Sequence, residues 1–290
     1  MKAYLDIVKK VLREGKRKLN RTGTDTFAIA GVMFEHDMSE GFPLLTTKSV
    51  PFRLIASELE FFIKGMTDKE WLQEQNNHIW DEWCTPLKIP YSHDPEVQEK
   101  MKEEKDLGPI YGYQWRNFDG AYIDHKTPLE STEGGIDQLK ELVKKLKEKP
   151  EDRRMIVTAY NPKQIKDMAL PPCHYGFQVT VIDGKLNLMW NQRSVDVALG
   201  LPFNIASYGL LLHLLAKESG FEEGRLVGFL GDTHIYENHV DGMKEQLKRE
   251  PYALPTIKTE DFTSIFEWKY QDTVKEGYMH HPKISFKIAV

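Results

Sequence analysis

The sequence predicts a layered fold of the α+β (α/β layered) class, in which helices pack on a β-sheet. Segments with apolar residues at helical spacing occur between runs of alternating β-forming residues. The chain has 290 residues, of which 40% are hydrophobic, so it can bury a sizeable core. Because no repeat or linker-like tract divides it, we expect a single domain over residues 1–290.

Four segments have the periodicity of helices. The N-terminal segment carries an apolar stripe between lysines, and two later segments repeat apolar residues three and four positions apart. The last segment is almost entirely apolar, as a buried helix is. The predicted helices are one within residues 1–18 and three more at 51–64, 135–148 and 204–219.

Strands are predicted where β-forming residues alternate after turn residues. The expected strands cover about residues 25–37, 153–160, 174–183 and 185–190. Residues 85–107 differ from the predicted helices and from the predicted strands because they are polar, charged and proline-bearing. We expect a surface insertion with one short helix there.

Charge and cysteine content exclude several classes of protein. The formal net charge of −5 argues against a polyanion as the main partner, since basic surfaces dominate nucleic-acid binders. Cys84 and Cys173 are too few for a disulfide scaffold, and we interpret Cys84 as incidental. The N-terminus lacks the continuous apolar run of a signal peptide, and no segment approaches the roughly 20 apolar residues that span a bilayer. We therefore expect a soluble, cytoplasmic protein.

Cys173 is the first candidate for chemistry. It lies in ALPPCHYGF, where two prolines restrict the backbone before the thiol and a strand-like segment follows it. A cysteine is often a small buried hydrophobe. The alternative is a nucleophile whose thiolate is stabilised by a nearby cation or by hydrogen bonds, from His174 or from an arginine.

Arginines in three places are candidates for binding an anion. Surface salt bridges would explain an adjacent pair equally well, because neighbouring residues of a strand point to opposite faces. Arg193, beside Ser194, lies between two apolar runs and so needs a partner. A phosphate would supply one through bidentate hydrogen bonds. The arginines are Arg21, the pair Arg153 and Arg154, and Arg193.

Three further polar residues occur in apolar surroundings. Asn204 precedes a strongly hydrophobic helix, where it is either a helix cap or an amide whose donor and acceptor pair with a uracil-like edge. His234 and Tyr236 are two residues apart and would share a face of an extended strand. Either could instead be a hydrogen-bonding residue of the core.

Motifs for metals and nucleotide cofactors are absent from the sequence. The ten histidines form neither HExxH nor an HxH pattern with a carboxylate, so no metal is expected. Neither GxGxxG nor GxxxxGK[ST] occurs, which disfavours a Rossmann or P-loop nucleotide site.

Nine segments together resemble the thymidylate synthase family, in the same order and over nearly the whole chain. They are RTGTDTF, GFPLLTTK, HIWDEW, LGPIYGYQWR, DRRMIVTAYNP, MALPPCH, NQRSVDVALGLPFNIASY, GDTHIYENH and the terminal KIAV. The resemblance implies the fold of that family, a large mixed β-sheet flanked by helices, with one face of the sheet forming a homodimer interface. It also implies reductive methylation of dUMP to dTMP.

The resemblance assigns roles in the reaction and in dUMP binding. Cys173 would add to C6 of the uracil, while Glu58, Tyr111, His174 and Asp196 would complete the catalytic group. Proton transfer by a positioned group typically contributes ~10²–10⁴-fold. The residues implied for dUMP are Arg21, Arg193 and Ser194 for the phosphate, Arg153 and Arg154 for the partner subunit's phosphate, Asn204 for the base, and His234 and Tyr236 for the sugar.

The co-substrate implied by the resemblance is 5,10-methylenetetrahydrofolate, which donates both the one-carbon unit and a hydride. Aromatic and apolar groups would hold its rings, Asp196 would bind the pterin nitrogens, and the terminal Val290 would help to close the site against water. The implied folate contacts are Ile79, Trp80, Trp83, Leu170, Asp196, Gly200, Phe203 and Val290.

Three positions depart from the family pattern. Tyr160 replaces the usual tryptophan, Asn191 stands where a tyrosine often precedes QRS, and Glu60 replaces a leucine two residues after Glu58. A second carboxylate could raise the pKa of Glu58. Because residues two apart on a helix diverge by about 200°, we predict little coupling between the two.

Two alternative functions remain open from the sequence. A hydroxymethylase of the same fold would use the same cysteine and folate, but water would replace the hydride. A dCMP-directed enzyme is expected to carry aspartate at position 204, so Asn204 favours uracil, whereas a dUMP hydroxymethylase is disfavoured only by Trp80 and the terminal valine. The other alternative is a non-catalytic RNA-binding protein, which the negative charge does not support.

Overall fold

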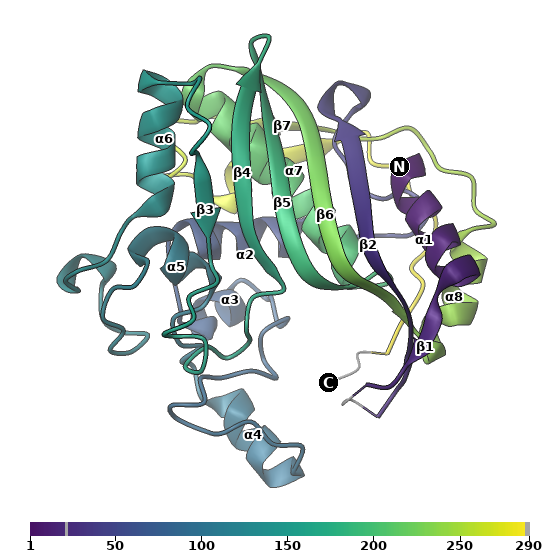
Figure 1. The fold of residues 1–290 in the computed structure, drawn as a ribbon, viewed down its shortest axis with the longest axis horizontal. Coiled ribbons are helices and arrows are strands. Elements are labelled where there is room, and N and C mark those ends of the chain that lie inside the picture. The colour runs from purple at the N-terminus through teal and green to yellow at the C-terminus, as the bar shows by residue number, and fades with distance from the viewer. Residues whose placement is uncertain (21–22, 288–290) are drawn as a thin grey trace.

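The structure is a computed structural model that describes residues 1–20 and 23–287 (Figure 1). Within these residues the main sheet has six strands in the order β1-β2-β6-β5-β4-β3. Neighbouring strands are antiparallel except β5 and β6, which are parallel. The strands are β1 Lys16–Lys18, β2 Thr26–Asp37, β3 Ile156–Thr158, β4 His174–Ile182, β5 Lys185–Asp196 and β6 Glu222–Tyr236.

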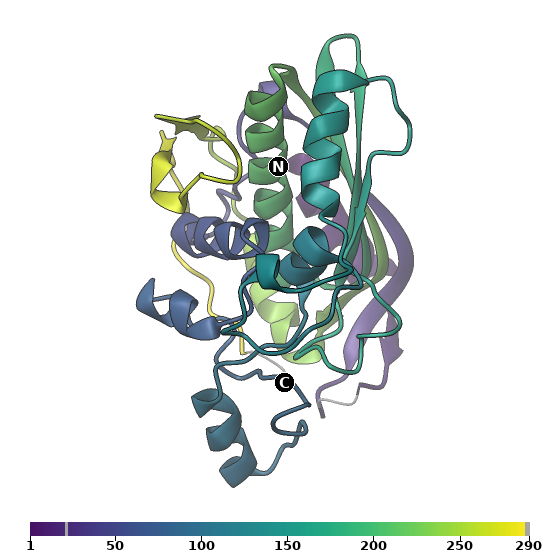
Figure 2. The ribbon, with the colours of Figure 1, turned by 90° about the vertical axis from the view of Figure 1, so that its left-hand side faces the viewer.

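Helices cover one face of this mixed sheet, as Figure 2 shows edge-on. The helices are α1 Lys2–Glu14, α2 Phe52–Ile63, α3 Lys69–Glu74, α4 Pro95–Glu103, α5 Tyr111–Asn117, α6 Gln138–Glu148, α7 Gly200–Ser219 and α8 Val240–Gln246. Single 3-10 turns are η1 Met38–Glu40, η2 Leu129–Ser131, η3 Glu237–His239 and η4 Tyr270–Asp272, and β7 Thr256–Thr259 pairs with β8 Thr273–Glu276. This arrangement confirms the predicted fold class.

The central helix α7 is apolar on all sides because it is covered on all sides. It packs on β5 and β6 with one face and against α2 and α6 with others. Its residues from Ile205 to Ala216 are all buried. The helix ends at Gly220, whose left-handed φ of 77° is the conformation that glycine adopts most readily after a helix. The main core of the protein therefore lies between the sheet and α2 and α7.

Most predicted elements are present with shifted ends. The strand expected at 153–160 is reduced to β3, and Arg153 and Arg154 lie in the turn before it, so placing that pair on a strand was wrong. Asp152 holds this turn because its carboxylate accepts hydrogen bonds from the backbone N–H and side chain of Arg154. The helix predicted from 204 begins at Gly200, with Pro202 in its first turn.

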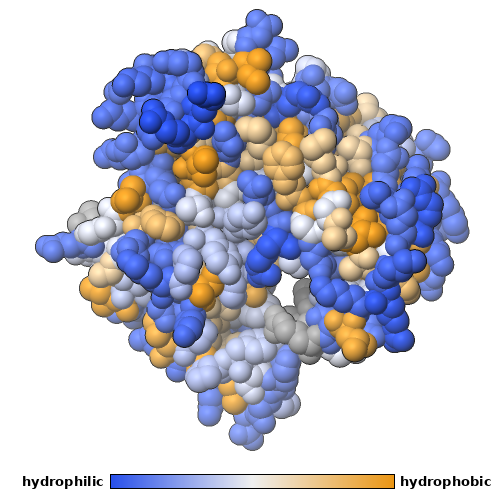
Figure 3. All heavy atoms as spheres, viewed as in Figure 1, coloured by the Kyte–Doolittle hydropathy of each residue, from blue (hydrophilic) through white to orange (hydrophobic). Residues whose placement is uncertain are grey.

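The opposite face of the sheet is largely uncovered and partly apolar. Met33 on β2 and its cross-strand neighbour Phe229 on β6 are 53% and 45% exposed. Tyr175 on β4, Ile156 and Tyr160 are also exposed. In Figure 3 these strands form an apolar area surrounded by polar side chains. Exposed apolar patches on a sheet are typical of surfaces that bind another protein.

The polar segment 85–107 contains one short helix, α4, as expected. This helix projects from the body of the protein in Figure 1, yet its last turn is anchored, because Met101 is buried. The fully buried Lys69 ammonium donates to the carbonyl oxygens of Asp81, Trp83 and Met101.

No helix in the described part of the chain is long and apolar enough to cross a membrane.

Candidate active site

Two adjoining cavities meet at the carboxyl end of β5, with volumes of about 420 and 320 Å³. Six residues line both: Trp83, Leu170, Cys173, Ser194, Asp196 and Tyr236. The larger cavity also contains Glu58, Ile79, Trp80, Tyr111, His174, Gln192, Val195, Leu199, Gly200, Phe203 and Asn204. The smaller contains Lys18, Leu19, Asn20, Thr26, Arg193, Asp232 and His234. We call the two cavities together the cleft.

The backbone of Cys173 is held from two sides at the start of β4. A β-bulge between His174 and Gly176 shifts the pairing of β4 with β5, as bulges next to functional sites often do. The N–H of Cys173 donates to the hydroxyl of Tyr111 at 2.8 Å, and its carbonyl accepts from the N–H of Arg193 at 2.8 Å. The thiol is therefore presented to the cleft from a rigid backbone.

The guanidinium of Arg193 supplies a cation beside the thiol. It donates through Nε to the carbonyl of Pro172 at 2.9 Å and through Nη2 to that of Pro171 at 2.8 Å. These bonds place Nη2 3.7 Å from Sγ of Cys173. A neighbouring positive charge favours the thiolate, which is the nucleophilic form of cysteine. The two prolines thus also fix the arginine through their carbonyl groups.

His174 does not share this role, although it follows Cys173 directly. Its Nδ1 forms a 2.9 Å hydrogen bond with the hydroxyl of Tyr208, and its ring packs 4.5 Å from that of Tyr111. Burial lowers the pKa of His174 to about 3, so the imidazole is neutral near pH 7. The cation that the sequence led us to expect beside the thiol is Arg193.

Glu58 is the carboxyl group of the larger cavity. Burial raises its pKa to about 7, and the 2.8 Å hydrogen bond from Nε1 of Trp80 opposes this shift. A carboxyl group with this pKa can both release and take up a proton near neutral pH. Glu60 faces elsewhere, because it pairs with Lys64 and accepts from the N–H of Tyr270 at 2.7 Å. This geometry agrees with the predicted lack of coupling between the two glutamates.

Tyr111 reaches the same cavity from the first turn of α5. Burial raises the pKa of its hydroxyl well above 10, and the neighbouring Cys173 adds to the shift, so the phenol stays protonated. The preceding loop depends on Gly108, where φ is 72° and a Cβ atom would lie 2.1 Å from the carbonyl oxygen of Asp167. This close approach of two backbones explains why Gly108 is the first glycine of LGPIYG.

A chain of hydrogen bonds orients the amide of Asn204 in the second turn of α7. Nε1 of Trp190 donates to Gln192, whose Nε2 donates to Oδ1 of Asn204 at 2.9 Å. The helix begins four residues earlier, so the helix-cap interpretation of Asn204 was wrong. We did not predict Gln192 as a site residue. Its signal was an amide on the buried face of a strand, in register with Trp190, where it requires a partner.

His234 and Tyr236 share one face of β6 and line the smaller cavity, as an extended segment requires. Nδ1 of His234 and Oδ1 of Asp232 are 2.8 Å apart, and Lys18 pairs with the other oxygen of Asp232. Since a carboxylate only accepts, the proton lies on Nδ1 and Nε2 of a neutral ring can accept from a ligand hydroxyl. Asp232 was not among the predicted site residues.

Comparison with known proteins assigns the chain to a family. Residues 2–290 match the family described as thymidylate synthase. The chain belongs to the thymidylate synthase family. It is also 43% identical over 287 residues to a protein of Paramecium tetraurelia named bifunctional dihydrofolate reductase-thymidylate synthase. That match covers 99% of this chain and 61% of the relative, so the chain spans less than two thirds of the relative's length.

The cleft contains most of the residues that the thymidylate synthase resemblance singled out, but not all of them. Arg153 and Arg154 are exposed and line neither cavity of the cleft. Arg21 and Val290 lie outside the described residues. In the ranges that are described, no group of three or more His, Cys, Asp or Glu side chains is placed to hold a metal ion.

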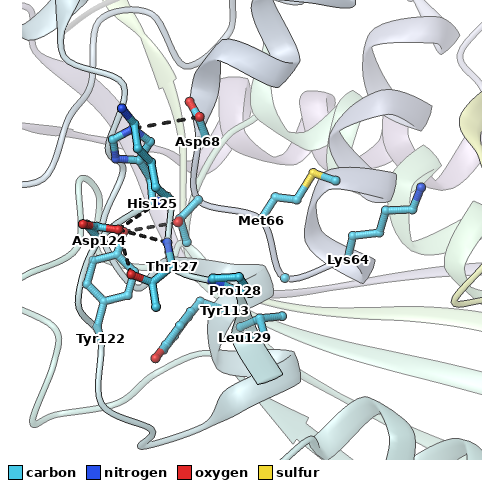
Figure 4. Close-up of a pocket in the computed structure, with 13 residues that line it drawn as sticks. Lys64, Met66, Asp68, Tyr113, Tyr122, Asp124, His125, Thr127, Pro128 and Leu129 are labelled. Atoms are coloured by element: carbon cyan, nitrogen blue, oxygen red, sulfur yellow. Dashed lines mark hydrogen bonds and ion pairs between the residues drawn. The ribbon is translucent and has the colours of Figure 1, made fainter. Parts of the chain in front are cut away.

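A separate cavity of about 230 Å³ contains another group of titratable residues (Figure 4). We call it the His125 cavity; it shares no lining residue with the cleft of this thymidylate synthase family member. The His125 ring lies between Asp68 and the buried Asp106, at 3.9 and 3.5 Å. Asp124 accepts from the N–H and hydroxyl of Thr127, both at 2.9 Å.

Proposed function

We propose that this protein is a thymidylate synthase that converts dUMP to dTMP with 5,10-methylenetetrahydrofolate and releases dihydrofolate. The observation that carries the proposal is Cys173, held at the junction of the two cavities with the Arg193 guanidinium 3.7 Å from its sulfur. One cavity would hold the nucleotide sugar and phosphate, and the other the base and the folate.

The nucleotide would bind with its base over Cys173 and its sugar in the smaller cavity. Arg193 and Ser194, which line the smaller cavity, would bind the phosphate together with Arg21, which lies outside the described residues. His234 and Tyr236 would bind the 3′-hydroxyl. Asn204, oriented by Gln192, would read the uracil O4 and N3 edge, since an amide offers both a donor and an acceptor.

Covalent activation of the base is the role proposed for Cys173. The thiolate attacks C6 of dUMP, a sulfur–carbon bond forms, and the electron pair of the C5–C6 double bond moves to C5 and is delocalised onto O4, which makes C5 nucleophilic. Glu58, with its pKa near 7, would exchange protons near O4 of the base through water. Tyr111 and His174 would order hydrogen bonds around the C5 proton that must leave. Once C5 has taken the one-carbon unit and lost its proton, hydride transfer from the folate would complete the methyl group, and breakage of the sulfur–carbon bond would restore the C5–C6 double bond and release dTMP and dihydrofolate.

The larger cavity fits a folate. Its walls carry the rings of Trp80, Trp83 and Phe203 beside the apolar Leu170 and Ile79, while the carboxylate of Asp196 offers acceptors for ring N–H groups. The folate would supply the one-carbon unit and the hydride that completes the methyl group. Gly200 and Val290 are the other proposed contacts, of which Val290 lies outside the described residues.

We also infer a homodimer formed through the uncovered sheet face. A hollow on that face is lined by Met33, Tyr175 and Phe229 and also by Arg193, which lines the cleft as well. A partner's side chains could therefore approach the phosphate position, which gives the exposed Arg153 and Arg154 a role in the neighbouring subunit. The low cysteine content supports a cytoplasmic location for the protein. We also propose that residues 1–290 form one domain.

Reaction of the purified protein with dUMP and methylenetetrahydrofolate tests the function. Formation of dihydrofolate, followed by absorbance, together with dTMP, identified by mass spectrometry, is expected. Hydroxymethyl-dUMP together with tetrahydrofolate would make the protein a hydroxymethylase with the same site. Absence of both products, together with salt-dependent retention of RNA on filters, would favour the non-catalytic alternative.

Subunit mixing tests the shared site. Arg153→Ala/Arg154→Ala subunits and Cys173→Ala subunits are each expected to be inactive. Random pairing should restore about a quarter of wild-type activity, because half of the dimers are mixed and each mixed dimer has one intact site. No recovery in dimers verified as mixed by mass spectrometry would contradict the sharing of arginines.

A further inference from the structure

The described end of the chain rests in a seat formed by three residues, Lys48, His239 and Gly242. The Phe286 ring lies 4.9 Å from the His239 ring, centre to centre. Nζ of Lys48 lies over the Phe286 ring, 5.0 Å from its centre. A Cβ atom on Gly242 would lie 2.5 Å from Cε1 of Phe286. Gly242 therefore leaves the space that the ring fills.

His239 connects this segment to the cleft. The fully buried ring has Nε2 2.7 Å from the carbonyl oxygen of Lys287, and because a carbonyl only accepts, Nε2 carries a proton. Nδ1 lies 3.8 Å from Oδ1 of Asp196 and has no hydrogen bond among the described residues. A neutral ring would direct a lone pair at this carboxylate, whereas a protonated ring directs an N–H at it.

The other cation of the seat also adjoins Asp196. Lys48 donates to the carbonyl of Ala198, and Asp196 accepts from the N–H of the same residue at 2.8 Å. Ala198 lies two residues before the start of α7, which carries Gly200 and Asn204 into the cleft. A shift of Lys48 or His239 would therefore move Asp196 and the start of α7, which form part of the wall of the larger cavity.

We propose that Lys48, His239 and Gly242 form a docking seat for Phe286, and that His239 is a positioning residue that couples the docked C-terminal segment to Asp196. The effect on folate affinity rests on the proposed function, since Asp196 is a proposed folate contact. The docking itself does not rest on it.

Charge in the seat gives the docking a pH dependence. Asp196 faces His239 from β5, Lys48 faces it from the loop before α2, and the Tyr236 ring packs against it from β6. Burial lowers the pKa of His239, but the nearby carboxylate of Asp196 and the hydrogen bond to the Lys287 carbonyl outweigh this effect, so that the pKa is raised above its ordinary value of 6.5. Docking is therefore strongest below this pKa and weakens as the pH rises through it. Burial lowers the pKa of Lys48 to about 8, which adds to the loss in alkaline solution.

Carboxypeptidase digestion of the full chain tests the seat without any need for activity. The rate at which Lys287 and Phe286 are released is measured by mass spectrometry for wild type, Gly242→Ala and the control Lys244→Ala, an exposed position on the same helix. We expect Gly242→Ala to release both about tenfold faster, although alanine favours the helix. In a Phe286→Ala background, Gly242→Ala should add nothing, because the clashing ring is absent. Equal release from wild type and Gly242→Ala would overturn the seat.

The role of His239 is tested with a matched pair of variants. His239→Gln retains an N–H donor for the Lys287 carbonyl but cannot be protonated, and His239→Phe removes the donor as well. For His239→Gln we expect release that no longer depends on pH between 6 and about 7.5, and a KM for methylenetetrahydrofolate raised several-fold with a smaller change in kcat. His239→Phe should release faster at every pH. A His239→Gln release profile parallel to that of wild type would overturn the coupling. Absence of synthase activity in wild type would overturn the proposed function but leave the digestion result valid.

Discussion

The cleft and the His125 cavity both contain buried titratable residues and aromatic rings, but the polar groups have different partners. In the His125 cavity they bind one another: Tyr122 donates to Asp106, and Asp124 accepts from the backbone and hydroxyl of Thr127. In the cleft, Arg193 is held by two proline carbonyls beside Cys173. There the polar atoms converge on a volume large enough for ligands.

The electrostatics of the cleft show the same difference. Burial moves the pKa of Glu58 up to about 7 and that of His174 down to about 3, so that one titratable group of the cavity can exchange a proton near neutral pH while the other stays neutral. Groups that satisfy one another stabilise a fold, whereas groups with shifted pKa values at an open cavity are suited to chemistry. Substitutions should therefore affect turnover in the cleft and stability in the His125 cavity.

The largest effect is expected from Cys173→Ser. A serine hydroxyl is a far weaker nucleophile at neutral pH, so kcat should fall by more than about 10³-fold. Binding of dUMP, measured by calorimetry, should persist because the neighbouring groups remain. Near-normal turnover in this variant would remove the nucleophile assignment and with it the contrast between the two cavities.

Glu58→Gln is expected to lower kcat by about 10²–10⁴-fold and to remove an inflection near pH 7 from the kcat profile.

The Glu58 carboxyl group should also make the stability of the wild-type protein depend on pH. Because the folded-state pKa is raised from 4.5, the folded protein binds the proton more tightly, and stability falls as the pH rises from 4.5 through about 7. The glutamine variant should lack this fall in urea denaturation at pH 5 and pH 8. A variant with the wild-type pH dependence would show that another group titrates.

Asn204→Asp should change the choice of base with a smaller loss of turnover. A protonated or ionised carboxyl group suits the C4 amino group of cytosine, so the ratio of kcat/KM for dCMP to that for dUMP should rise by about 10–100-fold. Gln192→Ala is the matched control, because it removes the hydrogen bond that orients Asn204. It should weaken the preference for dUMP over dCMP without reversing it. An unchanged ratio in Asn204→Asp would show that this amide does not read the base.

The smallest effect on turnover is expected in the His125 cavity. Asp106→Asn keeps the shape of the side chain but weakens acceptance from the Gly108 N–H and the Tyr122 hydroxyl and removes the negative charge 3.5 Å from the His125 ring. We expect a loss of about 1–3 kcal/mol in the free energy of unfolding, measured by urea denaturation, and less than a threefold change in kcat of the folded protein. A large loss of kcat with unchanged stability would mean that this cavity takes part in catalysis through the loop that precedes Tyr111.

Local sequence patterns were sufficient for much of the fold and for the choice of candidate residues. The spacing of apolar residues predicted α1, α2, α6 and α7 because helix formation depends on neighbours three and four residues apart. Strand β3 was predicted too long, since Asp152 forms a local turn that competes with extended backbone. The homodimer and the roles of the individual site residues stay predictions.

By itself the sequence determined which chemical groups the protein possesses: a thiol after two prolines, unusual arginines, and an amide before an apolar helix. Only the tertiary structure decided which of them meet. Arg193 reaches Cys173 because β4 and β5 pair with a bulge, Gln192 reaches Asn204 across the start of α7, and His174 turns to Tyr208 instead of the thiol. The physical reason is that burial and hydrogen bonding at a site depend on strands and helices brought together over long sequence separations, which no local pattern encodes.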